Sequence, residues 1–387
     1  MTGEEPLCMT ATRQPRLLSV QPVGDGGGSE TALIRMIRQL VAAGWECHVA
    51  VPPPVRLAAE YRAAGAVVHT VPMARLTTSG SAARWLAYAA RWPVTVGRLA
   101  RLARRVDAGV IHSNSLHCWY GWAAAALTRR PHVWHAREIV FQSALALRVE
   151  RWLTRHFADA VIAGSEAIGA QLQPAPVTVI RDEADPERFC PDRAGRFRAD
   201  VGIADGAPLV GSVARLDTWK GFDVLLDAFG ALREARTDVE LVIAGGTVAG
   251  KEDYAARLRS RAAALAGVHW LGPRDDVPDL MSDLDVFVQV STEPEPFGLV
   301  LVEALASGVP VVAGAEGGPL EIVSSRPTGQ LVPPGDPAAL ATAVLALLPV
   351  EPSSTASRQG RHPLRNPQPA RYAALFDRVA AYGRRRS

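Results

Sequence analysis

The sequence predicts an α/β fold with two parallel-sheet domains, and three observations support this. At 387 residues the chain is long enough for two or three domains of ordinary size. Short apolar segments alternate with helical patterns along the chain, and strands that alternate with helices form parallel sheets with covered faces. A polar segment rich in Pro, Gly and Asp, residues 182–206, separates two such series and is expected to be an interdomain linker.

The N-terminal series, residues 1–181, begins with a short buried strand at 16–20 that leads into a glycine-rich loop at 24–28. Ser29 can cap the next helix, whose apolar residues recur at helical spacing. Its apolar stripe contains Leu33, Ile34, Ile37, Leu40 and Val41. We expect further strands at 46–51, 66–70, 109–112, 132–135, 160–163 and 177–180, with helices between them, the longest at 81–106.

The C-terminal series occupies residues 207–350 and repeats the same alternation. Its strands are expected at 209–213, 240–244, 268–271, 286–290 and 309–312. Residues 351–370 include four Pro with several Ser and Arg, so we expect a loose linker there. The last segment, 371–387, can form a helix with Tyr372, Leu375, Phe376 and Val379 on its apolar side.

Composition is that of an ordinary soluble protein, with 48% hydrophobic and 21% charged residues. No apolar run approaches the roughly 20 residues that a membrane span needs. The N-terminus carries Glu4 and Glu5 in place of a basic-then-apolar signal pattern, so we expect a cytoplasmic protein. The four cysteines are scattered without a Cys-x-x-Cys pair, which is typical of reduced thiols.

Charge is distributed unevenly between the two halves. Residues 1–190 contain 21 Arg and 15 Asp+Glu, a balance of +6, and residues 191–387 contain 21 Arg+Lys and 24 Asp+Glu, a balance of −3. Many basic and aromatic residues lie on or near the long helix: Trp85, Arg91, Trp92, Arg98, Arg101, Arg104 and Arg105. The basic N-terminal domain either rests on the anionic inner face of a membrane or is a solvated surface. Nucleic acid is not expected as a partner, because the basic residues do not form a recognisable module with aromatics.

The most informative segment for chemistry runs from Glu295 to Glu303. The first carboxylate follows an apolar strand, and the second lies about one turn inside a helix that starts near Gly298. Anions bind where helix N-termini face the mouth of a parallel sheet. Carboxylates at such a place would repel a phosphate, but they accept hydrogen bonds from the vicinal diol of a ribose or a hexose.

This segment resembles the Glu-x7-Glu signature of retaining glycosyltransferases, specifically glycosyltransferase family 4. Four other segments resemble motifs of that family in the same order. They are Gly27-Gly28-Ser29-Glu30, Gly211 to Leu216 with Lys220-Gly221, Gly317-Gly318-Pro-Leu-Glu321, and residues 328–336. The likeness runs from about Arg16 to Leu348 and implies the GT-B architecture, two Rossmann-like domains facing each other across a cleft. In that architecture the last helix crosses back to the N-terminal domain.

The resemblance also implies an activity, namely transfer of a hexosyl unit with retention from a nucleotide-diphosphate sugar to an acceptor hydroxyl. We expect a UDP-sugar in preference to GDP-mannose. The acceptor is a small molecule, glycan or lipid of cell-envelope or secondary-metabolite biosynthesis. A GT-B epimerase or phosphorylase and a non-catalytic sugar-nucleotide-binding protein are the alternatives. A dehydrogenase is disfavoured, since Ser29 stands where the dinucleotide fingerprint needs its third glycine.

The leaving diphosphate must be neutralised, and the resemblance points to Arg215 and Lys220. An arginine fork bridges two phosphate oxygens, whereas a lysine acts as a point charge. Backbone N–H groups of Gly298, Leu299 and Val300 add to this at the helix start. We therefore expect no metal and no other cofactor. Asp283-Leu-Asp285, which matches a metal-binding pattern, is interpreted as structural.

Other roles follow from the resemblance residue by residue. Glu303 is expected to hold the ribose and Glu295 to contact the donor sugar, while Phe297-Gly298 permits close approach of the backbone. His135 ends a strand near the donor sugar and the acceptor, and a histidine there can shuttle protons. The predicted catalytic residues are thus Glu295, His135, Arg215 and Lys220, with Gly27 and Gly28 facing the diphosphate and His112 and Asn114 as acceptor-side candidates.

The chain departs from the family at its hinge. Asp182-Glu183-Ala184-Asp185 replaces the usual Asn-Gly before Val-Asp. Glycine adopts a positive φ without cost and glutamate does not, so we expect a different hinge geometry.

Overall fold

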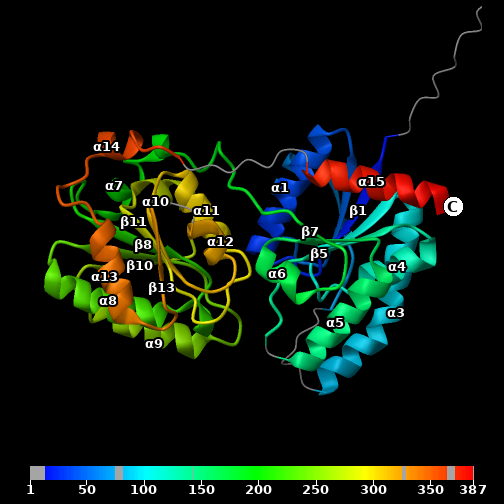
Figure 1. Cartoon of the computed structure of the whole chain (residues 1–387), viewed down its shortest axis with the longest axis horizontal. Coiled ribbons are helices and arrows are strands. Elements are labelled where there is room, and N and C mark those ends of the chain that lie inside the picture. The colour runs from blue at the N-terminus through cyan, green and yellow to red at the C-terminus, as the bar shows by residue number, and fades with distance from the viewer. Residues whose placement is uncertain (1–13, 75–81, 142, 325–327, 364–370, 387) are drawn as a thin grey trace, which may run out of the picture.

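The computed structural model of the chain describes residues 14–74, 82–141, 143–324, 328–363 and 371–386, without the side chains of 82–85 and 384–386. Two parallel sheets form two lobes that lie side by side (Figure 1). The predicted α/β fold with two parallel-sheet domains is confirmed.

The N-terminal sheet has seven strands in the order β3-β2-β1-β4-β5-β6-β7. The strands are β1 Arg16–Val20, β2 Glu46–Val51, β3 Ala66–Thr70, β4 Val110–Ser113, β5 His132–Ala136, β6 Ala160–Ala163 and β7 Val177–Val179. The helices are α1 Gly28–Ala42, α2 Ala58–Ala63, α3 Ala82–Arg105, α4 Tyr120–Thr128, α5 Ala144–Phe157 and α6 Glu166–Gln171. Strand order reverses between β1 and β4, and ligands of open parallel sheets bind at such a switch point.

The C-terminal sheet has six strands in the order β10-β9-β8-β11-β12-β13. The strands are β8 Leu209–Val213, β9 Glu240–Ala244, β10 Val268–Gly272, β11 Val286–Gln289, β12 Val311–Gly314 and β13 Gly329–Val332. The helices are α8 Phe222–Ala235, α9 Glu252–Ala263, α10 Val277–Asp283, α11 Leu299–Ala306, α12 Pro319–Val323 and α13 Pro337–Leu347.

Two strands of this sheet differ from the prediction. β12 begins two residues later than expected, because Pro310 has no N–H group to donate to the ladder. β13 was not predicted as a strand, since its four residues begin with a glycine and give no alternating pattern. It pairs in parallel with β12 at the edge of the sheet.

The two linkers are more ordered than the sequence predicts. Within 182–206 lie a 3-10 turn, η1 Pro191–Arg193, and helix α7 Phe197–Val201, and Phe197 is part of the C-terminal core. Within 351–370 lies helix α14 Thr355–Gln359, whose Arg358 is fully buried. The expectation of a loose linker is therefore wrong for 355–359, while 364–370 lie outside the described residues.

Helix α15, Arg371–Arg386, returns to the N-terminal lobe and completes its core (Figure 1). Phe376 packs edge-on against Trp45, whose indole nitrogen donates to Asp377 at 3.1 Å. This is the position that the resemblance implied for the last helix. Among the helices that the structure describes, none combines the length and apolarity that crossing a membrane requires.

Candidate active site

Lys220 and Glu295 form the centre of the candidate site. The Lys220 ammonium lies 2.6 Å from Glu295 Oε2, and both side chains are nearly buried, at 12% and 11% exposure. Ser291 Oγ donates to the same carboxylate oxygen at 2.9 Å. The ammonium also sits 3.8 Å from the centre of the Trp219 ring, where a cation is attracted by the π face.

Glycines make this approach sterically possible. Gly221, which follows the 3-10 turn η2 (Thr218–Lys220), has φ +73°, and a Cβ there would lie 1.8 Å from the carbonyl oxygen of Val290. Gly318 lies against the backbone of Phe297, where a Cβ would be 2.3 Å from the carbonyl oxygen. The loops after β8, β11 and β12 thus pack backbone to backbone, and this packing holds Glu295 against Lys220.

The remaining donor-side residues that were predicted follow strands β8 and β11, at the carboxyl edge of the C-terminal sheet. Arg215 follows β8 and is exposed, so its guanidinium is accessible to a ligand. Gly298 has φ +94° and begins α11, whose first residues Leu299 and Val300 are half-buried. The side chain of Phe297 is buried in the C-terminal core, so only its backbone can take part.

Glu303 is nearly buried on α11 and is paired with a residue of the other domain. Arg35 of α1 approaches Glu303 Oε1 at 2.5 Å through Nη2, with side-chain exposures of 12% and 8%. The other arm of Arg35 donates to the carbonyl oxygen of Glu183 at 2.7 Å. Burial raises the pKa of the Glu303 carboxyl, and the Arg35 charge opposes this.

In the N-terminal domain, Gly27 and Gly28 form the loop at the start of α1. The Glu30 carboxyl stabilises this loop, because it accepts a hydrogen bond from the Gly26 N–H at 2.6 Å. It also accepts from the Tyr61 hydroxyl at 3.4 Å. Burial raises the pKa of Glu30 to about 6. The loop glycines therefore have a supporting carboxyl whose charge changes close to neutral pH.

The structure places His135 and His112 in the interior of the N-terminal domain. Both are fully buried on the sheet face that α15 covers, with their rings 5.6 Å apart and Tyr372 5.9 Å from His135. Burial lowers the pKa of both imidazoles well below the ordinary value, with Arg137 contributing. Neither side chain has exposed surface in this arrangement, and the contact of His135 with the donor sugar and the acceptor stays a prediction.

Asn114 belongs to a buried polar network that the sequence did not predict. It donates to Gln21 at 2.7 Å and accepts from Arg137 at 2.7 Å. Arg137 also binds Asp182 of the linker at 2.7 Å, and the Tyr372 hydroxyl donates to the same carboxylate at 3.3 Å. The network joins sheet, linker and α15, and the acceptor-side role of Asn114 stays a prediction.

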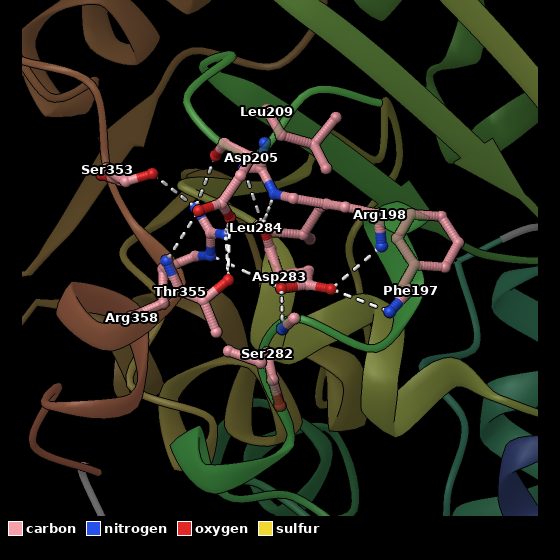
Figure 2. Close-up of polar contacts among 12 residues, drawn as sticks. Phe197, Arg198, Asp205, Leu209, Ser282, Asp283, Leu284, Ser353, Thr355 and Arg358 are labelled. Atoms are coloured by element: carbon pink, nitrogen blue, oxygen red, sulfur yellow. Dashed lines mark hydrogen bonds and ion pairs between the residues drawn. The ribbon is translucent and has the colours of Figure 1, made fainter. Parts of the chain in front are cut away.

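Asp283 and Asp285 have structural partners, as interpreted from the sequence. Asp283 accepts from the backbone N–H groups of Gly195, Phe197 and Arg198 at 2.5–3.1 Å (Figure 2). Asp285 is bound by Arg198 at 2.9 Å and by Arg361 at 2.8 Å. Within the described residues, no group of three or more His, Cys, Asp or Glu side chains could hold a metal ion.

Three residues close to the site escaped the sequence analysis. Ser291 lies just after the end of strand β11, and Trp219 directly precedes Lys220. These positions could have identified both residues as site candidates, because ligands bind at the carboxyl ends of parallel strands. Arg35 gave no local signal, because its role depends on how α1 lies relative to the other domain.

Comparison with known proteins agrees with this geometry. The sequence profile described as Glycosyltransferase Family 4 matches residues 26–188, and the profile described as Glycosyl transferases group 1 matches residues 194–360. D-inositol 3-phosphate glycosyltransferase of Salinispora arenicola is 30% identical over 370 residues, covering 84% of this chain and 80% of that protein. The lipopolysaccharide core biosynthesis mannosyltransferase LpsB of Rhizobium meliloti is 33% identical over 254 residues, covering 58% and 71%.

Solved structures give the same result. Anabaena HepE in complex with UDP-glucose matches with a TM-score of 0.74 and 26% identity, over 95% of this chain and 98% of that chain. Fold and site together define a glycosyltransferase of the GT-B architecture. The chain belongs to glycosyltransferase family 4.

Proposed function

We propose that the chain transfers a hexosyl unit with retention from a UDP-sugar to a hydroxyl of a small-molecule, glycan or lipid acceptor. The pair of Lys220 and Glu295 is the observation behind this proposal. The Lys220 ammonium suits the diphosphate of the donor, and the Glu295 carboxylate suits the hydroxyls of its sugar. The likeness to HepE, solved with UDP-glucose, supports uracil as the base. GDP-mannose is the second donor to test, since LpsB is named a mannosyltransferase.

In the proposed mechanism the acceptor oxygen bonds to the anomeric carbon while the bond from that carbon to the phosphate oxygen breaks. The acceptor proton passes to the leaving phosphate oxygen on the same face. Arg215, Lys220 and the first N–H groups of α11 stabilise the charge that develops on the diphosphate. Before this step, when the donor binds, Glu295 exchanges its bond with Lys220 for hydroxyls of the donor sugar, and Lys220 turns to the diphosphate. These groups neutralise the diphosphate without a metal or other cofactor.

A phosphate-bearing polyol is the first acceptor to test, because relatives of this chain are named for inositol phosphate and phosphatidyl-myo-inositol substrates. We place the reaction in the cytoplasm, in the synthesis of an envelope glycan, a lipid or a secondary metabolite. The excess of arginine in the N-terminal domain favours a site at the inner face of the membrane.

The test has two stages. A panel of sugar nucleotides is screened for thermal stabilisation, and each stabilising donor is then assayed for nucleotide release with and without acceptors. We expect nucleotide release that depends on the acceptor. Addition of a chelator should leave its rate within twofold of the rate without chelator. Release without any acceptor would favour the epimerase or phosphorylase alternative, and binding without turnover would favour the binding protein. A tenfold loss in chelator that magnesium restores would overturn the metal-free mechanism.

A further inference from the structure

Both glutamates of the proposed donor site already have a cationic partner, and one partner comes from the opposite domain. Glu295 is held by Lys220 within the C-terminal domain. Glu303 is held by Arg35, which is fixed on helix α1 of the N-terminal domain. The carboxylate expected to receive the ribose diol is therefore occupied by an arginine from across the cleft.

Arg35 is part of a set of arginines that bind the unusual acidic hinge. It donates to the Glu183 carbonyl oxygen at 2.7 Å, Arg38 pairs with Asp185 at 2.7 Å, and Arg137 pairs with Asp182 at 2.7 Å. Among the described residues other than glycine, only Asp107 and Arg129 have a positive φ. The residues of the acidic hinge therefore have no backbone strain of that kind. The family usually has a conformationally free glycine in this hinge, and here arginine contacts hold the hinge backbone and carboxylates instead.

The Arg35 side chain also has room to move. A cavity of about 460 Å³ lies between α1, the linker and Tyr372, and Arg35 forms part of its wall. Carboxylates of the linker, including that of the exposed Glu187, line the same cavity. Arg38, Arg181 and Arg188 line the cavity too, so its charge is mixed. A guanidinium that leaves Glu303 finds space there, and the Glu187 carboxylate is one group that it can approach.

We propose that Arg35 is a gate residue of the nucleotide site, which holds Glu303 in the donor-free chain and releases it when the ribose diol binds. This inference rests on the proposed function, because it takes Glu303 as the ribose ligand. Each ribose must displace one charge-assisted hydrogen bond, so part of the binding free energy is spent on releasing Arg35. Because that bond joins the two domains, nucleotide binding and interdomain contact become one linked equilibrium.

The test measures the affinity for UDP, and for GDP in parallel, by calorimetry in the full chain. Arg35→Gln removes the charge of the gate, and Arg38→Gln is the matched control on the same helix. With the gate removed, the buried Glu303 lacks a partner, and the diol supplies one. We expect Arg35→Gln to bind UDP roughly tenfold more tightly, the scale of one charge-assisted hydrogen bond. Arg38→Gln should stay within twofold of the wild type.

A second arm separates gating from a general structural effect. UDP is compared with its 2′,3′-dideoxy analogue, which lacks the diol but keeps base and diphosphate. The ratio of the affinity for UDP to the affinity for the dideoxy analogue should be larger in Arg35→Gln than in the wild type. Arg35→Lys should restore the wild-type ratio. Thermal melting confirms that each variant is folded.

The outcomes are distinguishable. Weaker or unchanged UDP binding in Arg35→Gln, or an unchanged preference over the dideoxy analogue, would overturn the gate while leaving the proposed function intact. A wild-type chain that binds neither UDP nor GDP would overturn the proposed function and this inference with it.

Discussion

Lys220 holds a compact ammonium between an aromatic ring and a carboxylate, and the size of that group matters. Of 42 basic residues in this chain, only Lys220 and Lys251 are lysines. The composition therefore favours arginine, yet lysine stands 3.8 Å from the Trp219 ring centre and 2.6 Å from Glu295. A planar guanidinium is larger and would not fit the same gap.

We therefore expect Lys220→Arg to lower kcat/KM by roughly tenfold, although the charge is kept, and Lys220→Ala to lower it by about 10²–10³. The control is Lys251→Arg, since Lys251 is 40% exposed and lies 3.9 Å from Asp217. Steady-state kinetics on the donor found by screening checks this. Full activity in Lys220→Arg would show that only the charge matters.

Glu30 makes stability depend on pH. Its folded pKa is raised from an ordinary 4.5 to about 6, so the folded state binds more protons than the unfolded state between these values. Stability contributed by the protonated carboxyl is therefore complete below pH 4.5 and is lost as the pH rises through about 6. The loss is roughly 1 kcal/mol, because solvent near the open loop screens part of the effect.

The variant Glu30→Gln tests this, since an amide imitates the protonated acid and still accepts from the Gly26 N–H. Denaturant unfolding at pH 4.5 should give equal free energies of unfolding for both proteins. At pH 7.5 the variant should be the more stable by roughly 1 kcal/mol. A variant that is less stable at pH 7.5 would mean that the loop needs the ionised carboxylate.

At the scale of elements, a cluster of buried charges fixes α14 to the C-terminal domain (Figure 2). Arg358 of α14 is fully buried and binds Asp205 and the carbonyl oxygen of Ser353. Its Nε lies 3.4 Å from Asp283. The cluster anchors α14 to the C-terminal domain, which explains why residues 355–359 form a helix there.

Arg358→Met should cost about 1–3 kcal/mol of unfolding free energy, because the fully buried guanidinium is the donor to the carbonyl oxygens of Asp205 and Ser353 and the cation beside the buried Asp283. The matched control is Arg236→Met, whose own side chain is 27% exposed where that of Arg358 is fully buried, and it should cost less than about 1 kcal/mol. Urea denaturation followed by circular dichroism measures both. Equal small losses would show that apolar packing can replace the cluster.

Helix α3 presents a basic face that suits an anionic surface. Arg98, Arg101 and Arg105 line one groove with His69 of the edge strand β3, and Leu86 and Val94 are exposed on the same helix. The side chain of Trp85 lies outside the described residues. In contrast, Leu99 and Leu102 are buried and form the core side of α3.

We expect the chain to sediment with liposomes of anionic lipid at low salt and to stay in solution at high salt, since exposed charges are screened. Replacing Arg98, Arg101 and Arg105 together by Gln should abolish sedimentation. The same replacement of Arg257, Arg259 and Arg261 on α9 is the control and should have no effect. Absence of sedimentation at low salt would leave the solvated surface as the explanation.

At the scale of the whole molecule, the two sheets and the donor-side motifs were predictable because their signals are local. Strand and helix periodicity depends on near neighbours, and the Lys220 and Glu295 motifs each lie in one loop. The positions of His135 and Arg35 were not predictable, because they depend on which element covers which face. α15 covers His135 from more than 230 residues further along the chain.

This dependence on distant elements gives a final prediction. Phe376 of α15 is fully buried, and its ring packs edge-on against Trp45 and against His112, with ring centres 5.9 and 5.7 Å away. Phe376→Ala should therefore cost about 3–5 kcal/mol, the range for a large cavity in a core. The loss should fall on the N-terminal domain, although residue 376 belongs to the end of the chain.

Hydrogen exchange measured by mass spectrometry localises the effect. In Phe376→Ala we expect protection to fall in β1, β2 and β4, while β8 and β11 stay protected. Phe229→Ala, which opens a cavity in the C-terminal core, is the mirror control and should expose β8 and β9. Equal loss of protection in both sheets of either variant would contradict two independent cores. It would mean that the interdomain bonds of Arg35 and Arg181 join the molecule into one cooperative unit.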